Sequence, residues 1–163
     1  MKNPISNAEF ISAIFSEVAN VAVCSKQGDP NEGGWSARIF NENSVLDNNS
    51  NNYVNCSSFN VHDGETFNVQ KQNFMALYFL LLDDLGTKIP FDRLGDLKLT
   101  WLIETSPGNF QGGIVLKDPI TDLAEAESVQ KSILNAGYGD RGAGGISRWA
   151  RDAVCHQWER KAP

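Results

Sequence analysis

The longest apolar run in the chain, residues 74–82, sets narrow limits on the fold. This run of nine residues is too short to cross a bilayer as a helix, so no transmembrane segment is expected. It lacks polar alternation, which favours a central strand buried on both faces of a sheet. Two aspartates, a leucine and a glycine follow it directly. We therefore expect a sheet in which acidic residues end the central strand.

Two helices are predicted on either side of the strands in the sequence. Ser6-Asn7-Ala8-Glu9 is a capping box and opens the first helix. Its apolar face is predicted from helical spacing to be Phe10, Ile11, Ile14, Phe15, Val18 and Val21. The second helix is predicted over residues 121–135. Its expected caps are Asp118 or Thr121 at the start and Gly137 at the end.

Other segments predict further strands, at residues 35–40, 53–59, 97–103 and 110–116. The last two are expected to form a hairpin with a long loop over residues 104–109. The order of helix, several strands and helix predicts an α+β domain with a largely antiparallel sheet.

Composition indicates one soluble domain in a reducing cytoplasm. Hydrophobic residues make up 41% and charged residues 21% of the 163 residues, as in ordinary globular domains. The N-terminus lacks the basic patch and apolar core of a secretion signal. Cys24, Cys56 and Cys155 are odd in number and lack metal-binding spacing, so reduced thiols are expected.

The net charge of −6 restricts the function. Strong non-specific binding to nucleic acid normally needs a basic surface. An acidic enzyme can still act on nucleotides when divalent cations neutralise its site. The charge therefore argues against a simple nucleic-acid-binding protein, while a metal-dependent nucleotide enzyme stays open.

Asp83 and Asp84 are the first candidates for a functional site. Carboxylates at the end of a strand suit Mg²⁺, which prefers carboxylate, water and phosphate ligands. Adjacent strand residues point to opposite faces, so both acids serve one site only if the backbone turns there, and Gly86 would help such a turn. The alternative is a strand that simply stops at solvated acids, because aspartate is disfavoured inside strands.

Residues 104–111 are the second candidate. Ser106, Gly108 and Asn109 offer a hydroxyl, a permissive backbone and an amide, and exposed N–H groups in such a loop can cradle phosphate oxygens. Gln111 can donate to a phosphate. The alternative is an ordinary hairpin loop.

A glycine-rich segment, residues 137–151, is the third candidate. It contains five glycines, Asp140 and the arginines Arg141, Arg148 and Arg151. Arginine binds phosphate in a bidentate manner, and a third carboxylate would complete a two-metal phosphoryl-transfer site. The alternative is a solvated C-terminal segment.

Four segments, taken in order, carry a resemblance to a known family. They are Asn-Tyr-Val-Asn-Cys-Ser-Ser-Phe at 52–59, Leu-Asp-Asp-Leu-Gly-Thr-Lys at 82–88, Glu-Thr-Ser-Pro-Gly-Asn-Phe-Gln at 104–111, and Asp140 followed by Ile-Ser-Arg-Trp-Ala-Arg at 146–151. Over about residues 35–151, the chain resembles the RepB-like primase domain of plasmids and phages, within the archaeo-eukaryotic primase superfamily.

The resemblance implies an RRM-like catalytic fold and template-directed nucleotidyl transfer by a two-metal mechanism. By position, Asp83, Asp84 and Asp140 would be the catalytic, metal-binding acids, with Mg²⁺ or Mn²⁺ as cofactor. The implied nucleotide-binding residues are Ser106, Gly108, Asn109, Gln111 and Arg148. Many superfamily members carry Asp-x-Asp, so the adjacent acids leave open which of Asp83 and Asp84 binds metal. The implied partners are single-stranded DNA template, nucleoside triphosphates and a replicative helicase.

The tail departs from this family. Residues 1–151 are interpreted as an incomplete catalytic core and residues 152–163 as an aberrant or divergent tail, because relatives usually continue with a Leu/Met-Pro stretch. A back-translation of the tail, shifted by one base, can read Met-Pro-Cys-Ala-Ile-Asn-Gly. We therefore expect truncation by a single-base insertion near the codon of Arg151, which the gene sequence would decide.

Two other functions stay open from the sequence. One is a non-catalytic nucleotide- or nucleic-acid-binding remnant of the same fold. The other is an α+β interaction domain that binds neither metal nor nucleotide.

Overall fold

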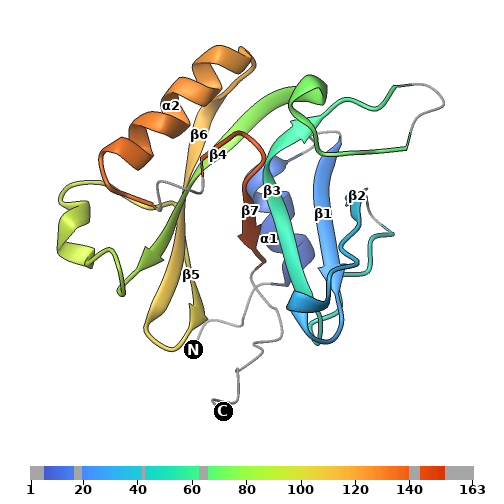
Figure 1. The fold of residues 1–163 in the computed structure, drawn as a ribbon, viewed down its shortest axis with the longest axis horizontal. Coiled ribbons are helices and arrows are strands. Elements are labelled where there is room, and N and C mark those ends of the chain that lie inside the picture. Colours follow the sequence, from blue (N-terminus) through green and yellow to red (C-terminus); the bar gives the residue numbers. More distant parts are fainter. Residues whose placement is uncertain (1–5, 17–19, 42, 63–65, 140–143, 153–163) are drawn as a thin grey trace.

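The computed structural model describes residues 6–16, 20–41, 43–62, 66–139 and 144–152. Its strands form one curled antiparallel sheet in the order β2-β1-β3-β4-β6-β5, and β7 pairs with β3 outside this path (Figure 1). The strands are β1 Val21–Lys26, β2 Ala37–Ile39, β3 Asn51–Phe59, β4 Phe74–Leu85, β5 Trp101–Ser106, β6 Asn109–Ile120 and β7 Trp149–Arg151. The helices are α1 Asn7–Phe15 and α2 Leu123–Asn135, with short 3-10 turns η1 Pro30–Glu32, η2 Lys71–Asn73 and η3 Phe91–Leu94. The predicted α+β domain with a largely antiparallel sheet is confirmed.

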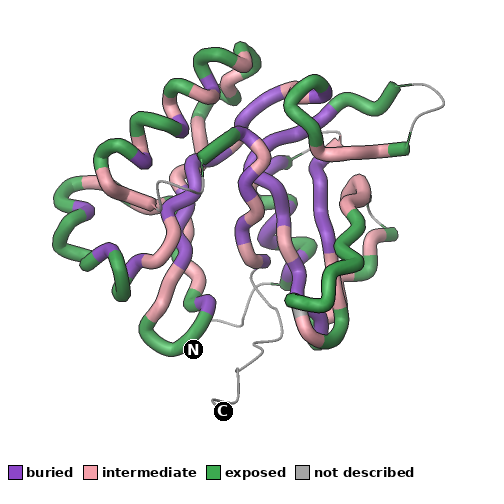
Figure 2. The backbone as a smooth tube through the Cα atoms, in the orientation of Figure 1, coloured by how far each residue is buried: buried purple, intermediate pink, exposed green. Residues whose placement is uncertain are grey.

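Strand β4 is the predicted central strand. It pairs with β3 on one side and with β6 on the other. Its apolar side chains divide between two clusters: Phe79 and Leu81 lie in the main core, whereas Leu82 and Leu85 pack with Ile89 in a second cluster. Because both faces of β4 are covered, the run needs no polar alternation, and most of the strand is buried in Figure 2.

The first helix begins as predicted and ends earlier. The side chain of Ser6 accepts from the backbone N–H of Glu9, and the Glu9 carboxylate accepts from the backbone N–H of Ser6, completing the capping box. The helix ends at Phe15, and Ser16 has a positive φ of 52°. The prediction that Val21 lies on the helix face is therefore wrong, and Val18 lies outside the described residues.

Val21 instead begins β1, a strand that the sequence reading missed. The short segment Val-Ala-Val-Cys is buried along its length and pairs with both β2 and β3. A strand of six residues next to a helix gives little periodicity of its own, so its identity depends on the partners that it finds.

Helix α2 starts at a different cap from the two that were predicted. Asp122 accepts from the backbone N–H of Glu125 at 2.8 Å, whereas Asp118 belongs to β6. Gly137 has a φ of 81° just beyond the helix, as expected for a terminator. Neither helix of the described ranges has the length and apolar character needed to span a membrane.

Strand β7 lies between the two halves of the sheet. On the same edge of β3, residues Tyr53 to Asn55 pair with β7, while residues Ser57 to Phe59 pair with β4. Figure 1 shows β7 beside β3, with α1 behind them and α2 along β4 and β6. The backbone N–H of Asp152 donates to the carbonyl of Asn52 at 3.0 Å and Asp152 is fully buried, so this residue, placed in the tail above, packs with the domain.

Candidate active site

The two adjacent aspartates sit on a β-bulge. Leu82 pairs with Gly112 and Leu85 pairs with Phe110, so Asp83 and Asp84 on β4 together oppose the single residue Gln111 on β6. Asp84 has a positive φ of 58°, which breaks the strand alternation. Bulges bend a strand and re-aim its side chains, which supplies the backbone turn that a shared site requires. We call Asp83, Asp84 and Gln111 the acidic bulge.

A tight turn follows the acidic bulge and holds it in place. The carbonyl of Asp84 accepts from the Ile89 backbone N–H at 3.0 Å and from the Thr87 hydroxyl at 3.1 Å. Gly86 has a φ of 82°, and a Cβ atom placed on it would lie 2.6 Å from the carbonyl oxygen of Gly108. Glycine is therefore required both for the turn and for the close approach of the β5–β6 hairpin.

The β5–β6 hairpin differs from the long loop that was predicted. Ser106 pairs with Asn109, so only Pro107 and Gly108 form the turn. Gly108 has a φ of 75°, and Pro followed by a residue of positive φ is the pattern of a type II turn. The Gly108 N–H, expected to face a phosphate, donates to Glu104 Oε1 at 2.9 Å.

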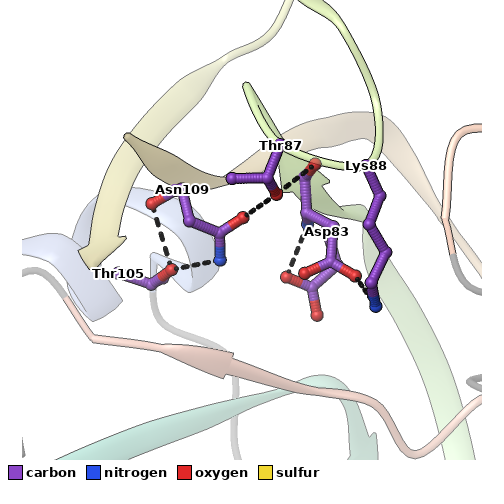
Figure 3. Close-up of polar contacts among 6 residues, drawn as sticks. Asp83, Thr87, Lys88, Thr105 and Asn109 are labelled. Carbon is purple, nitrogen blue, oxygen red and sulfur yellow. Dashed lines mark hydrogen bonds and ion pairs between the residues drawn. The ribbon is translucent and has the colours of Figure 1, made fainter. Parts of the chain in front are cut away.

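Asn109 joins the hairpin to the turn after the acidic bulge. Its Oδ1 accepts from the Thr87 hydroxyl at 2.6 Å, and its Nδ2 donates to the Thr105 hydroxyl at 3.1 Å (Figure 3). Figure 3 shows Asp83 and Lys88 beside these contacts. The structure thus brings Asp83, Asp84 and Asn109 together, while Ser106 lies exposed at the hairpin end.

Gln111 and Arg148 are both buried and bonded to backbone. Gln111 Oε1 accepts from the Arg151 backbone N–H at 2.8 Å, and Arg148 Nη1 donates to the Leu81 carbonyl at 2.7 Å. Gln111 is 8% and Arg148 is 7% exposed. These contacts fix β7 against β4 and β6. The predicted phosphate contacts of both residues would need these bonds to be shared or exchanged.

Lys88 is a site residue that the sequence reading missed. Its Nζ lies 2.7 Å from Asp84 Oδ2. The spacing of four residues between acid and lysine could have suggested the pair, although that spacing is a helical signal and this segment is a turn. Asp83 Oδ1 accepts from the Asp84 backbone N–H at 2.9 Å.

The oxygen donors of the acidic bulge fit a hard divalent cation. Carboxylates are the protein ligands that Mg²⁺ prefers. The ion pair with Lys88 shows that a positively charged group can bind at the Asp84 carboxylate. Within the described ranges, no three His, Cys, Asp or Glu side chains gather as a metal-binding group. Asp140, the predicted third acid, lies outside the described residues.

Comparison with known proteins supports the fold. No protein-family model matches the chain, and no curated protein sequence matches it. The chain is similar to the AEP domain of the primase-polymerase of cyanophage S-2L, with a TM-score of 0.69 and 14% identity over 94% of this chain and 85% of that one. It is also similar to the catalytic domain of primase RepB', solved in complex with initiator DNA, with a TM-score of 0.60 and 13% identity over 93% of this chain and 76% of that one. The chain therefore has the fold of a RepB-like primase-polymerase catalytic domain.

Proposed function

We propose that this chain is a DNA primase/polymerase domain of plasmid or phage replication, which transfers nucleotides on a single-stranded DNA template. The observation that carries the proposal is the acidic bulge: two consecutive carboxylates oppose one residue of β6, beside a hairpin, in a primase-polymerase fold. Bulges often lie next to active sites, and the two carboxylates of this bulge are partly exposed near the end of β4.

Under this proposal, Asp83 and Asp84 hold Mg²⁺ or Mn²⁺, with Asp140 as the third acid. When bound, the cations would neutralise the triphosphate and stabilise the charge that develops during phosphoryl transfer. The Lys88 ammonium, which is largely exposed and lies 2.7 Å from Asp84 Oδ2, would then exchange Asp84 for the negative charge of the nucleotide.

The remaining assigned residues surround this pair. Asn109, Ser106 and Gly108 lie on the hairpin that packs against the turn after Asp84, where they would contact the phosphates. Gln111 and Arg148 bond to the backbone of β7 and β4. They would thereby hold in place the strands that carry and support the two acids. A replicative helicase is a further proposed partner, with no described residue assigned to it.

A second function is a nucleotide- or nucleic-acid-binding remnant without catalysis. The Lys88–Asp84 ion pair favours it, because the lysine ammonium neutralises one of the two carboxylates without a metal ion. The two functions differ in whether incorporation occurs at high Mn²⁺.

The test is primer synthesis and extension by the chain with single-stranded DNA, nucleoside triphosphates and Mn²⁺. Asp83→Asn and Asp84→Asn are each expected to lower incorporation by at least about a hundredfold, the scale of losing a charge-stabilising group. The matched control is Asp118→Asn, an exposed acid at the far end of β6, which should retain activity. Incorporation that survives both substitutions in the acidic bulge would exclude this site. Absent incorporation with retained nucleotide binding would favour the remnant.

A further inference from the structure

A second concave region lies on the half of the sheet away from the acidic bulge. It is a hollow of about 520 Å³ lined by Cys24, Trp35, Ala37, Tyr53 and Trp149. Three of these five residues are aromatic. We call it the aromatic hollow. It uses β1, β2, β3, β7 and the segment before β2, none of which carries a residue assigned to the acidic bulge.

The sheet itself builds the floor of the hollow. Ala37 pairs with Cys24, Cys24 pairs with Tyr53, and Tyr53 pairs with Arg151, which makes one cross-strand row. Side chains of directly paired residues lie on the same face. Trp35 meets Tyr53 edge to face, with ring centroids 5.3 Å apart and planes at 85°.

The aromatic rings remain open to contact from outside. Trp35 is 37% exposed, the largest aromatic exposure of this region, and Tyr53 and Trp149 are half-buried. An exposed tryptophan beside a small alanine floor leaves room for a flat group. Core packing alone would bury these rings further.

Cationic side chains flank the rings, although the chain carries a net charge of −6. Lys26 Nζ lies 6.0 Å from the Trp35 ring centroid, and Arg151 Cζ lies 5.7 Å from the Tyr53 centroid. Arg38 follows Ala37 on β2 and donates to the Ser25 hydroxyl at 3.1 Å on the opposite face of the sheet, so it does not belong to this rim. Acids also occur in the preceding segment, but Asp29 caps η1 by accepting from the Asn31 N–H.

The thiol of the hollow adds no negative charge. Burial raises the pKa of Cys24 from 9.0 to about 12, against a smaller opposing effect of Arg38. Cys24 therefore stays protonated near neutral pH and serves as a small apolar wall.

From these observations we infer that the aromatic hollow binds a base of single-stranded DNA, with Lys26 and Arg151 holding the adjacent phosphates. Stacking on aromatic rings and a cationic rim are the two elements that single strands require. A surface without a ligand would need neither the exposed ring of Trp35 nor the two cations beside the rings, and a duplex hides its base faces.

The row of the hollow also leads toward the acidic bulge. Arg151, the last member of the row, donates its backbone N–H to Gln111, which opposes Asp83 and Asp84. At the usual spacing of adjacent β-strands, the hollow lies on the order of 15–20 Å from the acids. A few nucleotides of extended single-stranded DNA would span this distance. The inference rests on the proposed function in making the bound strand the template.

The test measures binding of the full chain to a fluorescently labelled oligodeoxythymidylate by anisotropy, without metal or nucleoside triphosphate. The oligonucleotide has about 20 nucleotides, which exceeds a typical single-strand site size. Trp35→Ala is expected to weaken binding by about five- to a hundredfold, as for loss of one stacked base. Trp35→Phe should restore most of the affinity. Leu102→Ala, an exposed apolar residue on β5, is the matched control and should bind as the parent chain does.

The charged rim has its own readout. Lys26→Ala should reduce the dependence of binding on salt by about 0.7 in the log–log slope, as for one phosphate contact on a single strand. Lys117→Ala, an exposed lysine on β6, should leave the slope unchanged. Thermal unfolding of each variant shows that the fold is retained.

The outcomes separate this inference from the proposed function. Equal binding by Trp35→Ala and the parent chain overturns the inference, and so does a parent chain that binds no oligonucleotide but incorporates nucleotides. Equal affinity for free dTTP and for the oligonucleotide also overturns it, because the hollow would then be a nucleotide site. Trp35-dependent binding without any incorporation supports the inference and overturns the proposed function.

Discussion

The acidic bulge and the aromatic hollow are built in different ways within one sheet. The bulge takes its residues from consecutive segments, residues 83–111, and tight turns hold it. The hollow gathers residues from position 24 to position 149 across four strands. A site made from neighbouring hairpins can keep its shape through local hydrogen bonds. A site assembled from distant strands depends on every pairing between them, and here the pairing of β7 joins the two regions.

The largest expected effect breaks the acidic bulge without touching the hollow. Gly86→Ala forces a side chain into a φ of 82° and against the Gly108 carbonyl, so we expect a loss of about 2–4 kcal/mol in the free energy of unfolding. Urea denaturation measures it. Gly28→Ala is the control, because Gly28 has the same φ of 82° with no atom within 4 Å, and it should cost only about 1 kcal/mol. Equal losses would show that the hairpin contact contributes nothing.

The next effect cuts the connection between the two regions. Gln111→Ala leaves the partly buried N–H of Arg151 without the acceptor that it has at 2.8 Å, which should cost about 1–3 kcal/mol. Both incorporation and oligonucleotide binding should weaken, while Gln111→Glu retains an acceptor and should recover part of the stability. Gln72→Ala, exposed on η2, should change neither. An effect of Gln111→Ala on one region alone would show that β7 does not couple them.

A smaller effect belongs to the hollow and depends on pH. Because burial raises the pKa of Cys24 from 9.0 to about 12, the unfolded thiol ionises first as pH rises above 9, and the stability present below that pH is lost on the way to pH 12. Between pH 8 and pH 10, Cys24→Ala should lose less stability than the parent chain, by about 1 kcal/mol. Chemical denaturation at the two pH values measures this difference. Parallel pH dependence in both proteins would contradict burial of the thiol.

The smallest effect sharpens the description of the bulge alone. Lys88→Ala removes an ion pair whose lysine is largely exposed, so stability should change by only a few tenths of a kcal/mol. Mn²⁺ affinity, measured by calorimetry, should rise a few-fold because the lysine ammonium no longer competes with the metal ion for Asp84. Lys98→Ala, exposed before β5, is the control. Weaker Mn²⁺ binding by Lys88→Ala would mean that the lysine organises the site.

Local patterns predicted the parts of the fold that local physics decides. The capping box of α1 and the buried strand β4 appear directly in the sequence, since each depends on a few consecutive residues. Asn109 is linked to Asp84 through Thr87, whose hydroxyl contacts both the Asn109 side chain and the Asp84 carbonyl. The roles of Asp83, Asp84 and Asn109 in catalysis stay predictions.

Other features could not be predicted because they depend on strand register. The two-for-one pairing at Gln111 follows from how β4 aligns with β6, which no single segment determines. The hairpin turn is short because Ser106 finds Asn109 as its partner. The aromatic hollow was missed for the same reason: Cys24, Tyr53 and Trp149 become neighbours only when β1, β3 and β7 align.

The position of β7 also affects how the chain folds as it is synthesised. Tyr53 pairs with Arg151, so part of the β3 edge has no ladder partner until nearly the whole described chain has left the ribosome. Closing so long a loop is slow, and an open strand edge invites pairing between nascent chains. Production of this protein should therefore be sensitive to translation rate and to the chaperones that shield exposed strands.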